Sequence, residues 1–562
     1  MKLQHRKDKK KVLKITSLGG VGNVTKNLFV YEYGNDIIVV DCGIGFPSGE
    51  MPGVDIIIPD VHYLLEREEK IRGFIITHGH EDHFGALPYV LPQFKRNIPV
   101  FATELVSGFI SVKLQSFGQE KTYLKIVDPD KGPFRLGVFN ITPFRVNHSV
   151  PDSVGYIIKT PQGTIVHVSD FKFDWTPVSD KPFEVARLTK NISGGVRVLL
   201  SDCLGSLVEG YTRTEKDIEK IFDSLLDSAL GQVFVTTISS NISRMQQAIN
   251  ASVRHNRKVA LLGYSVNKNV RVAEKLGYLK IPRGTLIKPE KAASYPSHAV
   301  TYIIAGSYGQ KSSALFRLAS GKHRFAKLKQ GATVIFSADP SPPGVKDDVD
   351  VVVGKLTELG ADVHHYEIQE NLHISGHGVQ GDLMMLVSIV EPLYVVPIGG
   401  APSMMRGYKK LVKKCGVASK NVLELKEGQT INISESGVFL GKVVKTYDVL
   451  VDGLGVGVVG SIILRDRRTL AQSGLLLVVI PLDKSTKEIR GEIQVISKGF
   501  VFEKAAQDIL DEVKKITYKV VGTSIKNKKV DNIKSCLKKE LRRFLFREIE
   551  KRPIILPIIV RV

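Results

Sequence analysis

The chain has 562 residues, which exceeds what one hydrophobic core usually holds and predicts roughly three structural units. Its composition, 43% hydrophobic and 24% charged, is that of a folded, water-soluble protein, and no apolar run reaches the ~20 residues of a membrane-spanning helix. Lys and Arg outnumber Asp and Glu by 79 to 57, and this net charge of +22 would attract a polyanion such as RNA or DNA, although charge alone identifies no partner.

The first eleven residues are basic, and no apolar signal-peptide core follows them. We expect residues 1–11 to form a disordered tail and the protein to be cytoplasmic. The four cysteines are scattered and make no CxxC pair, which predicts neither a disulfide framework nor a thiolate zinc site. Any metal must then be held by His and carboxylate side chains.

A β-rich unit opens the chain. The segments 12–20, 27–33, 36–43 and 74–80 are rich in β-branched residues and are separated by Gly, Asn and Asp, as strands and turns are. We expect this first unit to extend over residues 12–214.

Strand-like and helical segments alternate over residues 215–370, which favours a mostly parallel, doubly wound sheet covered on both faces. The expected strands are 232–238, 258–264, 300–306, 333–339 and 361–368. Residues 243–255 have helical periodicity, with Met245, Ile249 and Val253 on one face.

Residues 371–450 are predicted to return the chain to the first unit, so that the middle unit is an insertion. A linker at 451–465 precedes a small C-terminal α+β domain, residues 466–562. Its last helix carries Leu537, Leu541 and Leu545 at four-residue spacing. The opposite face of that helix is basic, which is typical of a solvated surface and also compatible with RNA contact.

The motif HGHEDH directly follows the apolar run FIIT and supplies His78, His80, Asp82 and His83. Imidazole and carboxylate ligands suit zinc or manganese, so this loop predicts a metal site. His148, in VNHSVPD, and Asp170, in VSDFKFD, also follow strand-like runs. Loops at strand ends are where a rigid sheet positions functional groups.

This set of motifs resembles the metal-binding pattern of the metallo-β-lactamase superfamily. The resemblance implies an αββα sandwich with two divalent ions, Zn or Mn, at one edge. His78, His80 and His148 would hold the first ion, Asp82 and His83 the second, and Asp170 would bridge them. Asp41, in VVDCGIGFP, matches a position that supports the ligand loop. Two ions ~3.5–4 Å apart activate water and clamp a phosphodiester.

The superfamily also cleaves lactams and thioesters, so the substrate must be inferred from the middle unit. TTISSNISRMQQ, HISGHG and SDCLGS resemble motifs of the β-CASP insertion of nucleic-acid hydrolases. The resemblance assigns His377 to the scissile phosphate, as a proton donor or by charge stabilisation, and Asp202 to orienting that histidine. Ser240 and Asn241 would contact the terminal nucleotide.

Residues 373–378 form a short Gly-containing loop before a helical run, comprising His373, Ile374, Ser375, Gly376, His377 and Gly378. Backbone N–H groups in such a loop can bind a phosphate, with Ser375 adding its hydroxyl. The same residues also fit an ordinary turn.

The C-terminal segments LRDRRTLAQSG, SKGFVF and KRPIILPII resemble signatures of the ribonuclease J family. The resemblance implies a 5′-to-3′ exoribonuclease that prefers 5′-monophosphate ends, with some endonuclease activity, in RNA maturation and decay. It also implies dimers or tetramers. Asp55 and Asp452 match positions that bind a structural calcium in some relatives, and they are otherwise surface acids.

The chain departs from the family pattern near the proposed site. In VVPIGGAPSMM, Gly399 replaces the histidine that completes the second metal site, and Ala401 replaces a Glu. Asn23, Tyr308 and Gln310 stand where the family usually has other residues.

These departures keep a second reading open, a weakly active or inactive subunit that binds RNA and a catalytic paralogue. The retained ligands and His377 favour an active enzyme. A third reading, hydrolysis of small molecules, is disfavoured by the β-CASP-like unit and by the basic charge.

Overall fold

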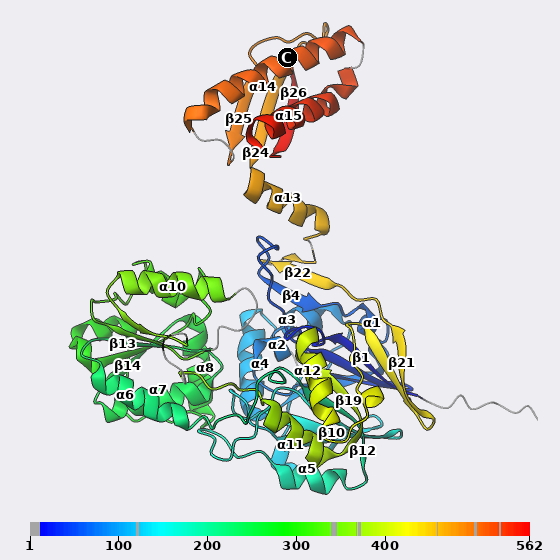
Figure 1. Ribbon diagram of the computed structural model, residues 1–562, viewed down its shortest axis with the longest axis vertical. Coiled ribbons are helices and arrows are strands. Elements are labelled where there is room, and N and C mark those ends of the chain that lie inside the picture. The colour runs from blue at the N-terminus through cyan, green and yellow to red at the C-terminus, as the bar shows by residue number, and fades with distance from the viewer. Residues whose placement is uncertain are drawn as a thin grey trace, which may run out of the picture. The chain divides into compact units, whose positions relative to one another are not determined.

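The computed structural model describes residues 12–119, 123–338, 345–366, 368, 372–453, 455–457, 459–499, 503–527 and 530–562. The predicted tail, residues 1–11, lies outside the described residues. Contacts divide the chain into two compact units (Figure 1), Met1–Phe46 with Ile57–Val449 and Pro47–Ile56 with Leu450–Val562. None of the described helices is both long enough and apolar enough to cross a membrane.

Two sheets of unit 1 combine strands from before and after the middle of the chain, with strand orders β21-β20-β1-β2-β3-β5-β6-β7 and β19-β12-β11-β10-β9-β8. The strands of the first sheet are β21 (Gly437–Val443), β20 (Gln429–Ser434), β1 (Leu13–Gly19), β2 (Leu28–Tyr33), β3 (Asp36–Val40), β5 (Ile71–Ile75), β6 (Val100–Ala102) and β7 (Leu124–Ile126). Those of the second are β19 (Pro392–Ile398), β12 (Val196–Asp202), β11 (Gly163–Val168), β10 (Val154–Thr160), β9 (Phe139–Arg145) and β8 (Phe134–Leu136).

One hydrophobic core joins the two sheets. Phe29 and Tyr31 of β2 belong to the same fully buried cluster as Tyr156 of β10 and Leu199 of β12. Helices α3 (Leu87–Val90) and α4 (Glu104–Ser116) accompany the first sheet, and α5 (Val185–Ile192), α11 (Gln380–Val390) and α12 (Pro402–Lys413) cover the second (Figure 1). This arrangement confirms the predicted αββα sandwich.

The middle of the chain forms a separate parallel sheet with strand order β15-β14-β16-β13-β17-β18. The strands are β13 (Val233–Thr236), β14 (Lys258–Leu262), β15 (Leu286–Ile287), β16 (Val300–Ile304), β17 (Thr333–Phe336) and β18 (Asp362–His364). The helices are α6 (Asp217–Ser228), α7 (Ile242–Arg254), α8 (Tyr264–Lys275), α9 (Ala314–Ala319) and α10 (Lys346–Glu358). Helix α10 covers one face and α6 and α7 the other (Figure 1), which confirms the doubly wound insertion.

Helix α7 follows its predicted apolar face only in part. Met245 and Ile249 are fully buried, whereas Val253 near the helix end is 37% exposed. Arg244 on the same helix is also fully buried, and its ion-pair partner Glu215 is buried with it.

Unit 2 contains a three-stranded sheet with the order β25-β24-β26. Its elements are α13 (Ser461–Ser473), β24 (Leu475–Leu482), β25 (Gln494–Lys498), α14 (Glu503–Lys526), α15 (Ile533–Ile549) and β26 (Ile554–Arg561). Leu537, Leu541 and Leu545 of α15 are fully buried against this sheet, as their spacing predicts. The segment interpreted as a linker, 451–465, includes the end of β22 (Asp448–Asp452), β23 (Gly455–Val456) and the start of α13.

Candidate metal centre

The predicted metal ligands meet at one edge of the sandwich because each follows the carboxyl end of a strand. His78 follows β5, His148 follows β9 and Asp170 follows β11. His80, Asp82 and His83 lie in and next to the short helix α2 (Glu81–Phe84), which continues the loop after β5. Residues far apart in the sequence therefore converge on the carboxylate of Asp170.

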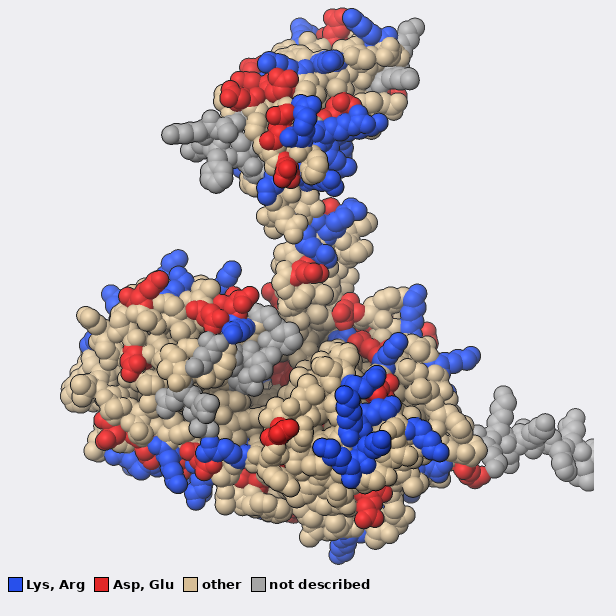
Figure 2. All heavy atoms as spheres, viewed as in Figure 1, with Lys and Arg blue, Asp and Glu red and all other residues tan. Residues whose placement is uncertain are grey.

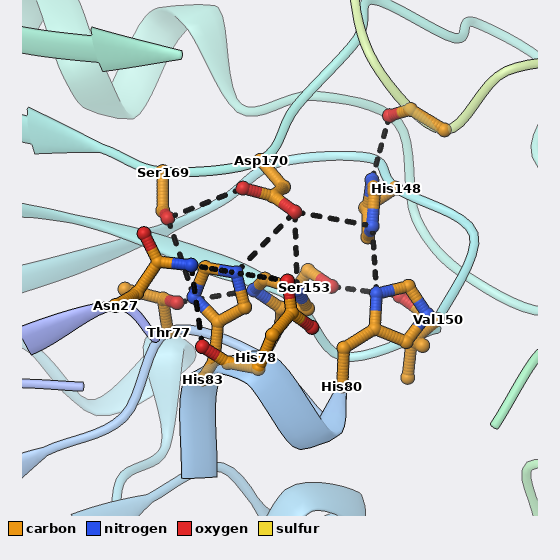
Figure 3. Close-up of polar contacts among 12 residues, drawn as sticks. Asn27, Thr77, His78, His80, His83, His148, Val150, Ser153, Ser169 and Asp170 are labelled. Atoms are coloured by element: carbon orange, nitrogen blue, oxygen red, sulfur yellow. Dashed lines mark hydrogen bonds and ion pairs between the residues drawn. The ribbon is translucent and has the colours of Figure 1, made fainter. Parts of the chain in front are cut away.

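Atom Oδ2 of Asp170 is the centre of this cluster (Figure 3). It lies 3.6 Å from Nε2 of His78, 3.4 Å from Nε2 of His83 and 3.7 Å from Nε2 of His148. Nδ1 of His80 lies 3.0 Å from Nε2 of His148. Such separations match those between ligands of one ion at ~2.0–2.2 Å from each.

The first ligand set fits a divalent cation. Nε2 of His78 is buried and has no hydrogen-bond partner among the described residues, an arrangement that leaves its lone pair for a metal. Nδ1 of His148 donates to the carbonyl of Gly376 at 2.7 Å, so its Nε2 is also an acceptor. Nε2 of His80 lies 3.1 Å from the hydroxyl of Ser149, leaving Nδ1 for the ion.

Burial lowers the pKa of each imidazole in this set. It lowers the pKa of His80 to about 3, and burial together with neighbouring histidines holds those of His78 and His148 well below 6.5. The neutral imidazole is the form that binds metal. The site therefore presents three neutral imidazoles and one carboxylate.

The second ligand set, Asp82, His83 and Asp170, is less complete. Nδ1 of His83 donates to Asp41 at 2.7 Å, but its Nε2 lies 3.1 Å from the side-chain amide nitrogen of Asn27. A protein donor thus already faces the atom that would bind the second ion.

Gly399 lies beside this set and supplies no side-chain ligand. A Cβ atom at this position would lie 3.6 Å from Oδ1 of Asp202 and 3.9 Å from Oδ1 of Asp170, which is ordinary van der Waals contact. Its φ of +66° is in the left-handed region, which disfavours most residues other than glycine.

Asp202 and His377 form a dyad beside the cluster. Oδ2 of Asp202 accepts from Nδ1 of His377 at 2.7 Å, and Nε2 of His377 lies 3.7 Å from Oδ2 of Asp170. Burial lowers the pKa of His377, but Asp202 and Asp170 outweigh it and raise the value to about 9. The imidazole of His377 is held with Nε2 directed at Asp170, the centre of the ligand cluster.

The predicted phosphate loop, residues 373–378, packs directly on the ligands. A Cβ at Gly376 would lie 2.6 Å from the ring of His148, so only glycine fits there. The amide of His377 donates to Oγ of Ser375 at 3.0 Å, and that of Gly378 donates to the carbonyl of Phe171 at 2.5 Å. These two amides are engaged within the protein, whereas the hydroxyl hydrogen of Ser375 remains available as a donor.

The other predicted substrate residues have structural contacts of their own. Asn241 is the N-cap of α7, where its side-chain oxygen accepts from the amide of Arg244 at 2.9 Å, and Ser240 beside it is buried. His373 is partly exposed and Ile374 is buried. Nucleotide contact by these residues stays a prediction.

Three residues at which the chain departs from the family lie in loops. Asn23 accepts the amide of Thr25 at 3.1 Å, Tyr308 is partly buried and Gln310 is exposed. Ala401 is the N-cap of α12 and makes no side-chain capping bond there.

Asp55 and Asp452, the possible calcium ligands, lie in unit 2. Oδ2 of Asp55 accepts the amide of Gly453 at 2.8 Å, and Asp452 pairs with Arg467. Within the described parts of the chain, neither belongs to a cluster of three or more possible metal ligands.

Sequence reasoning missed three polar residues that orient the ligands. They are Asn27 beside His83, Thr77, which donates to Asp41 and contacts Nδ1 of His78, and Ser149 beside His80. Thr77 and Ser149 each adjoin a predicted ligand in the sequence, and this adjacency is the signal that could have identified them. Asn27 carries no such signal, because the contact spans 56 residues.

Comparison with protein-family models identifies four regions. Residues 37–188 match the beta-lactamase superfamily domain and 230–356 the ribonuclease J beta-CASP domain. Residues 363–423 match the Zn-dependent metallo-hydrolase RNA specificity domain, and 462–562 the ribonuclease J C-terminal domain.

The chain is similar over nearly its whole length to curated proteins. It is 34% identical to Ribonuclease J 1 of Streptococcus pyogenes, covering 97% of each chain, and 34% identical to Ribonuclease J2 of Bacillus subtilis, covering 98% of this chain and 99% of that one. A crystal structure of a protein of unknown function from Enterococcus faecalis shares the fold, with a TM-score of 0.52 at 14% identity, covering 75% of this chain and all of that one. With identity above 30% over both full lengths, and with the β-CASP and C-terminal models matched in one chain, this protein belongs to the ribonuclease J family.

Proposed function

We propose that this protein is a metal-dependent ribonuclease that hydrolyses the phosphodiester bonds of RNA. The observation that carries the proposal is the position of the Asp202–His377 dyad, whose Nε2 lies 3.7 Å from the Asp170 carboxylate at the centre of the ligand cluster. A proton donor is thus held beside the groups that would bind a metal, in a chain of the ribonuclease J family.

Each group has a distinct part in the reaction. His78, His80, His148 and Asp170 would hold a divalent ion, Zn or Mn, and Asp82 and His83 a second one. Such ions supply Lewis-acid stabilisation of the phosphate and favour deprotonation of the attacking water. Asp202 keeps Nδ1 of His377 protonated, and Nε2 of that ring donates a proton to the leaving oxygen or stabilises the charge on the phosphate.

The 373–378 loop is proposed to bind the 5′-terminal phosphate and so to favour 5′-to-3′ exonucleolysis of 5′-monophosphorylated RNA, beside internal cleavage. Gly376 joins the loop to His148 through its carbonyl, and this contact sets the loop close to the ligands. The hydroxyl of Ser375 is the donor that we assign to the phosphate.

RNA affinity outside the centre would come from basic surfaces. Lys and Arg side chains gather over α12 (Figure 2), where Lys410, Lys413 and Lys414 are exposed. Such charges bind phosphates without reading sequence. We further propose a cytoplasmic role in RNA maturation and decay, carried out as a homodimer or tetramer or together with a paralogue.

Gly399 favours a second candidate function. With no side chain at this position, and with the amide of Asn27 beside Nε2 of His83, the second metal site lacks a ligand. The protein would then be a weakly active or inactive subunit that binds RNA and a catalytic paralogue.

Degradation of end-labelled single-stranded RNA with Mn²⁺ or Mg²⁺ tests both candidates. The RNA carries either a 5′-monophosphate or a 5′-triphosphate, and an Asp170→Asn variant controls for contaminating nucleases. Metal-dependent cleavage that is lost in the variant supports the enzyme. RNA binding without cleavage at any metal concentration favours the subunit, and absence of RNA binding at low salt contradicts both.

A further inference from the structure

A buried network of charged side chains links the metal centre to the middle domain. Its members are Lys172 and Asp174, which follow the ligand Asp170, together with Glu215 and Arg244. All four side chains are at most 2% exposed. Ionised side chains are seldom buried so completely unless partners hold them in one arrangement.

Arg244 uses its whole guanidinium group in this network. Nε donates to Gln247 at 3.2 Å and Nη2 to Glu215 at 2.7 Å. Nη1 donates to the hydroxyl of Ser337 and to the carbonyl of Leu372, the latter at 3.2 Å. The hydroxyl of Ser337 also donates to the carbonyl of Leu372, at 2.6 Å. Leu372 immediately precedes the 373–378 loop. The hydrogen bonds from Arg244 and Ser337 therefore fix the backbone at the start of that loop.

Glu215 connects Arg244 to the strand ends of the sandwich. Its Oε1 lies 3.8 Å from Nζ of Lys172, and its amide donates to Asp174 at 2.9 Å. Burial raises the pKa of Glu215, but Arg244 and Lys172 outweigh it and lower the value below its usual range, so the carboxylate is ionised. Two cations and two anions then balance within the network.

The network also reaches both sides of the metal cluster through the backbone. The amide of Lys172 donates to the carbonyl of Asn147, the residue before His148, at 2.8 Å. The carbonyl of Phe171 accepts from Gly378 at the far end of the loop. The loop is therefore held at Leu372 by Arg244 and Ser337 of the middle domain, and at Gly378 by Phe171, the residue after the candidate ligand Asp170.

We propose that Arg244 is a positioning residue, which fixes the 372–378 loop, and with it His377, relative to the metal centre. The inference rests on the proposed function of that loop as the 5′-phosphate site. Among the described residues, the side-chain partners of Arg244 include none of the candidate metal ligands, and we assign its effect to Leu372 and Glu215. Arginine is required because a lysine ammonium cannot reach acceptors on opposite sides in the fork geometry of a guanidinium.

Binding of hydrolysis-resistant single-stranded RNA with a 5′-phosphate or a 5′-hydroxyl tests the proposal. We expect the wild-type protein to prefer the phosphate, and Arg244→Lys to lose about tenfold of that preference, since small misplacements of a binding group have large effects. The melting temperature and the metal content of Arg244→Lys are measured in parallel. Values close to those of the wild type would show that the variant is folded and retains its metal.

Arg254→Lys is the matched control. Arg254 lies on the same helix, but its side chain is 42% exposed and makes ion pairs with Glu219 and Asp223, which lie outside the loop. This variant should keep the full preference. Ser337→Ala removes only the hydroxyl between Arg244 and Leu372, and it provides a milder second variant with a smaller loss of preference if Arg244→Lys does not fold.

Hydrogen exchange of residues 372–378 separates this proposal from the proposed function. Faster exchange in Arg244→Lys, with no change in Arg254→Lys, is the expected result. Unchanged exchange and unchanged end preference in Arg244→Lys and Ser337→Ala would overturn the positioning role. If the wild-type protein binds both RNAs equally, the loop is not a 5′-phosphate site. The hydrogen-exchange rates of residues 372–378 would still show whether Arg244 holds the loop.

Discussion

The carboxylate of Asp202 accepts a hydrogen bond from Nδ1 of His377 at 2.7 Å. Asp202 is fully buried at the end of β12, whereas His377 lies in the loop before α11, 175 residues later. This bond fixes the orientation of the imidazole, and it leaves Nε2 facing the Asp170 carboxylate.

Replacing His377 with Ala should lower the rate of RNA cleavage ~10²–10⁴-fold, the usual contribution of a general acid. Asp202→Asn should lower it less, since the ring remains but is no longer held in one orientation. The measurement is kcat on single-stranded RNA with Mn²⁺, with RNA affinity as the control. A full rate in both variants would remove the dyad from the mechanism.

Replacing His80 and Asp82 with Ala should abolish cleavage while RNA affinity changes by less than about threefold. Phosphate contacts by Lys and Arg supply most non-specific affinity and do not depend on the metal ligands. Filter binding and cleavage assays on the same preparations check this expectation. An equal loss of binding and cleavage would mean that the metals hold the fold together.

Metal content should be closer to one tightly bound ion than two. In the proposed assignment, His78, His80, His148 and a bridging Asp170 would give the first ion a full tetrahedral set for zinc, whereas the second ion would have no side-chain ligand at Gly399. Activity should therefore rise steeply with added Mn²⁺, which tolerates water and oxygen ligands. Elemental analysis of the purified protein measures the content.

Gly399→His should raise occupancy of the second position. A Cβ there would lie in ordinary van der Waals contact with Asp202 and Asp170, at 3.6 and 3.9 Å, but the left-handed backbone should lower stability by ~1–2 kcal/mol. Two tightly bound ions in the unmodified protein would show that another group already completes the site. Two ions in the variant with no cleavage in either protein would favour the inactive-subunit function.

Ser375→Ala should reduce the preference for 5′-monophosphate over 5′-triphosphate RNA. The hydroxyl is the proposed phosphate donor, and its oxygen also accepts the amide of His377 at 3.0 Å, so cleavage should slow by about tenfold as well. Initial rates on the two end-labelled RNAs give the ratio. Equal wild-type rates on both ends would argue against a closed 5′-phosphate pocket.

Stability should respond to pH through Asp180. Burial and the nearby Asp152 raise the pKa of Asp180 to about 7, so the folded protein holds a proton that the unfolded chain releases at a lower pH. The stabilisation of the folded protein by this bound proton is present at low pH and is lost as the pH rises from about 4 to 7. Between pH 5 and 8, the free energy of unfolding of Asp180→Asn should therefore improve relative to wild type by ~2–3 kcal/mol, as measured by urea unfolding. A difference in the free energy of unfolding between variant and wild type that stays constant from pH 5 to 8 would contradict the raised pKa of Asp180.

Element types and candidate ligands can be predicted from the sequence because their signals are local. The β-branched-rich runs at β1, β2 and β3 and the strand-helix alternation after residue 215 depend on neighbouring residues, and each motif with candidate ligands follows a strand. HGHEDH places four candidate ligands within six residues, so their proximity hardly depends on the fold.

Only the tertiary structure decides which atoms face the metal and which residues hold them there. The carbonyl of Gly376 orients His148 across 228 residues, and the amide of Asn27 meets His83 across 56. Arg244 is fully buried because Glu215 and the carbonyl of Leu372 reach it from segments that are distant in the sequence. A buried charge depends on partners that are distant in sequence, and hydrophobic periodicity carries no record of them.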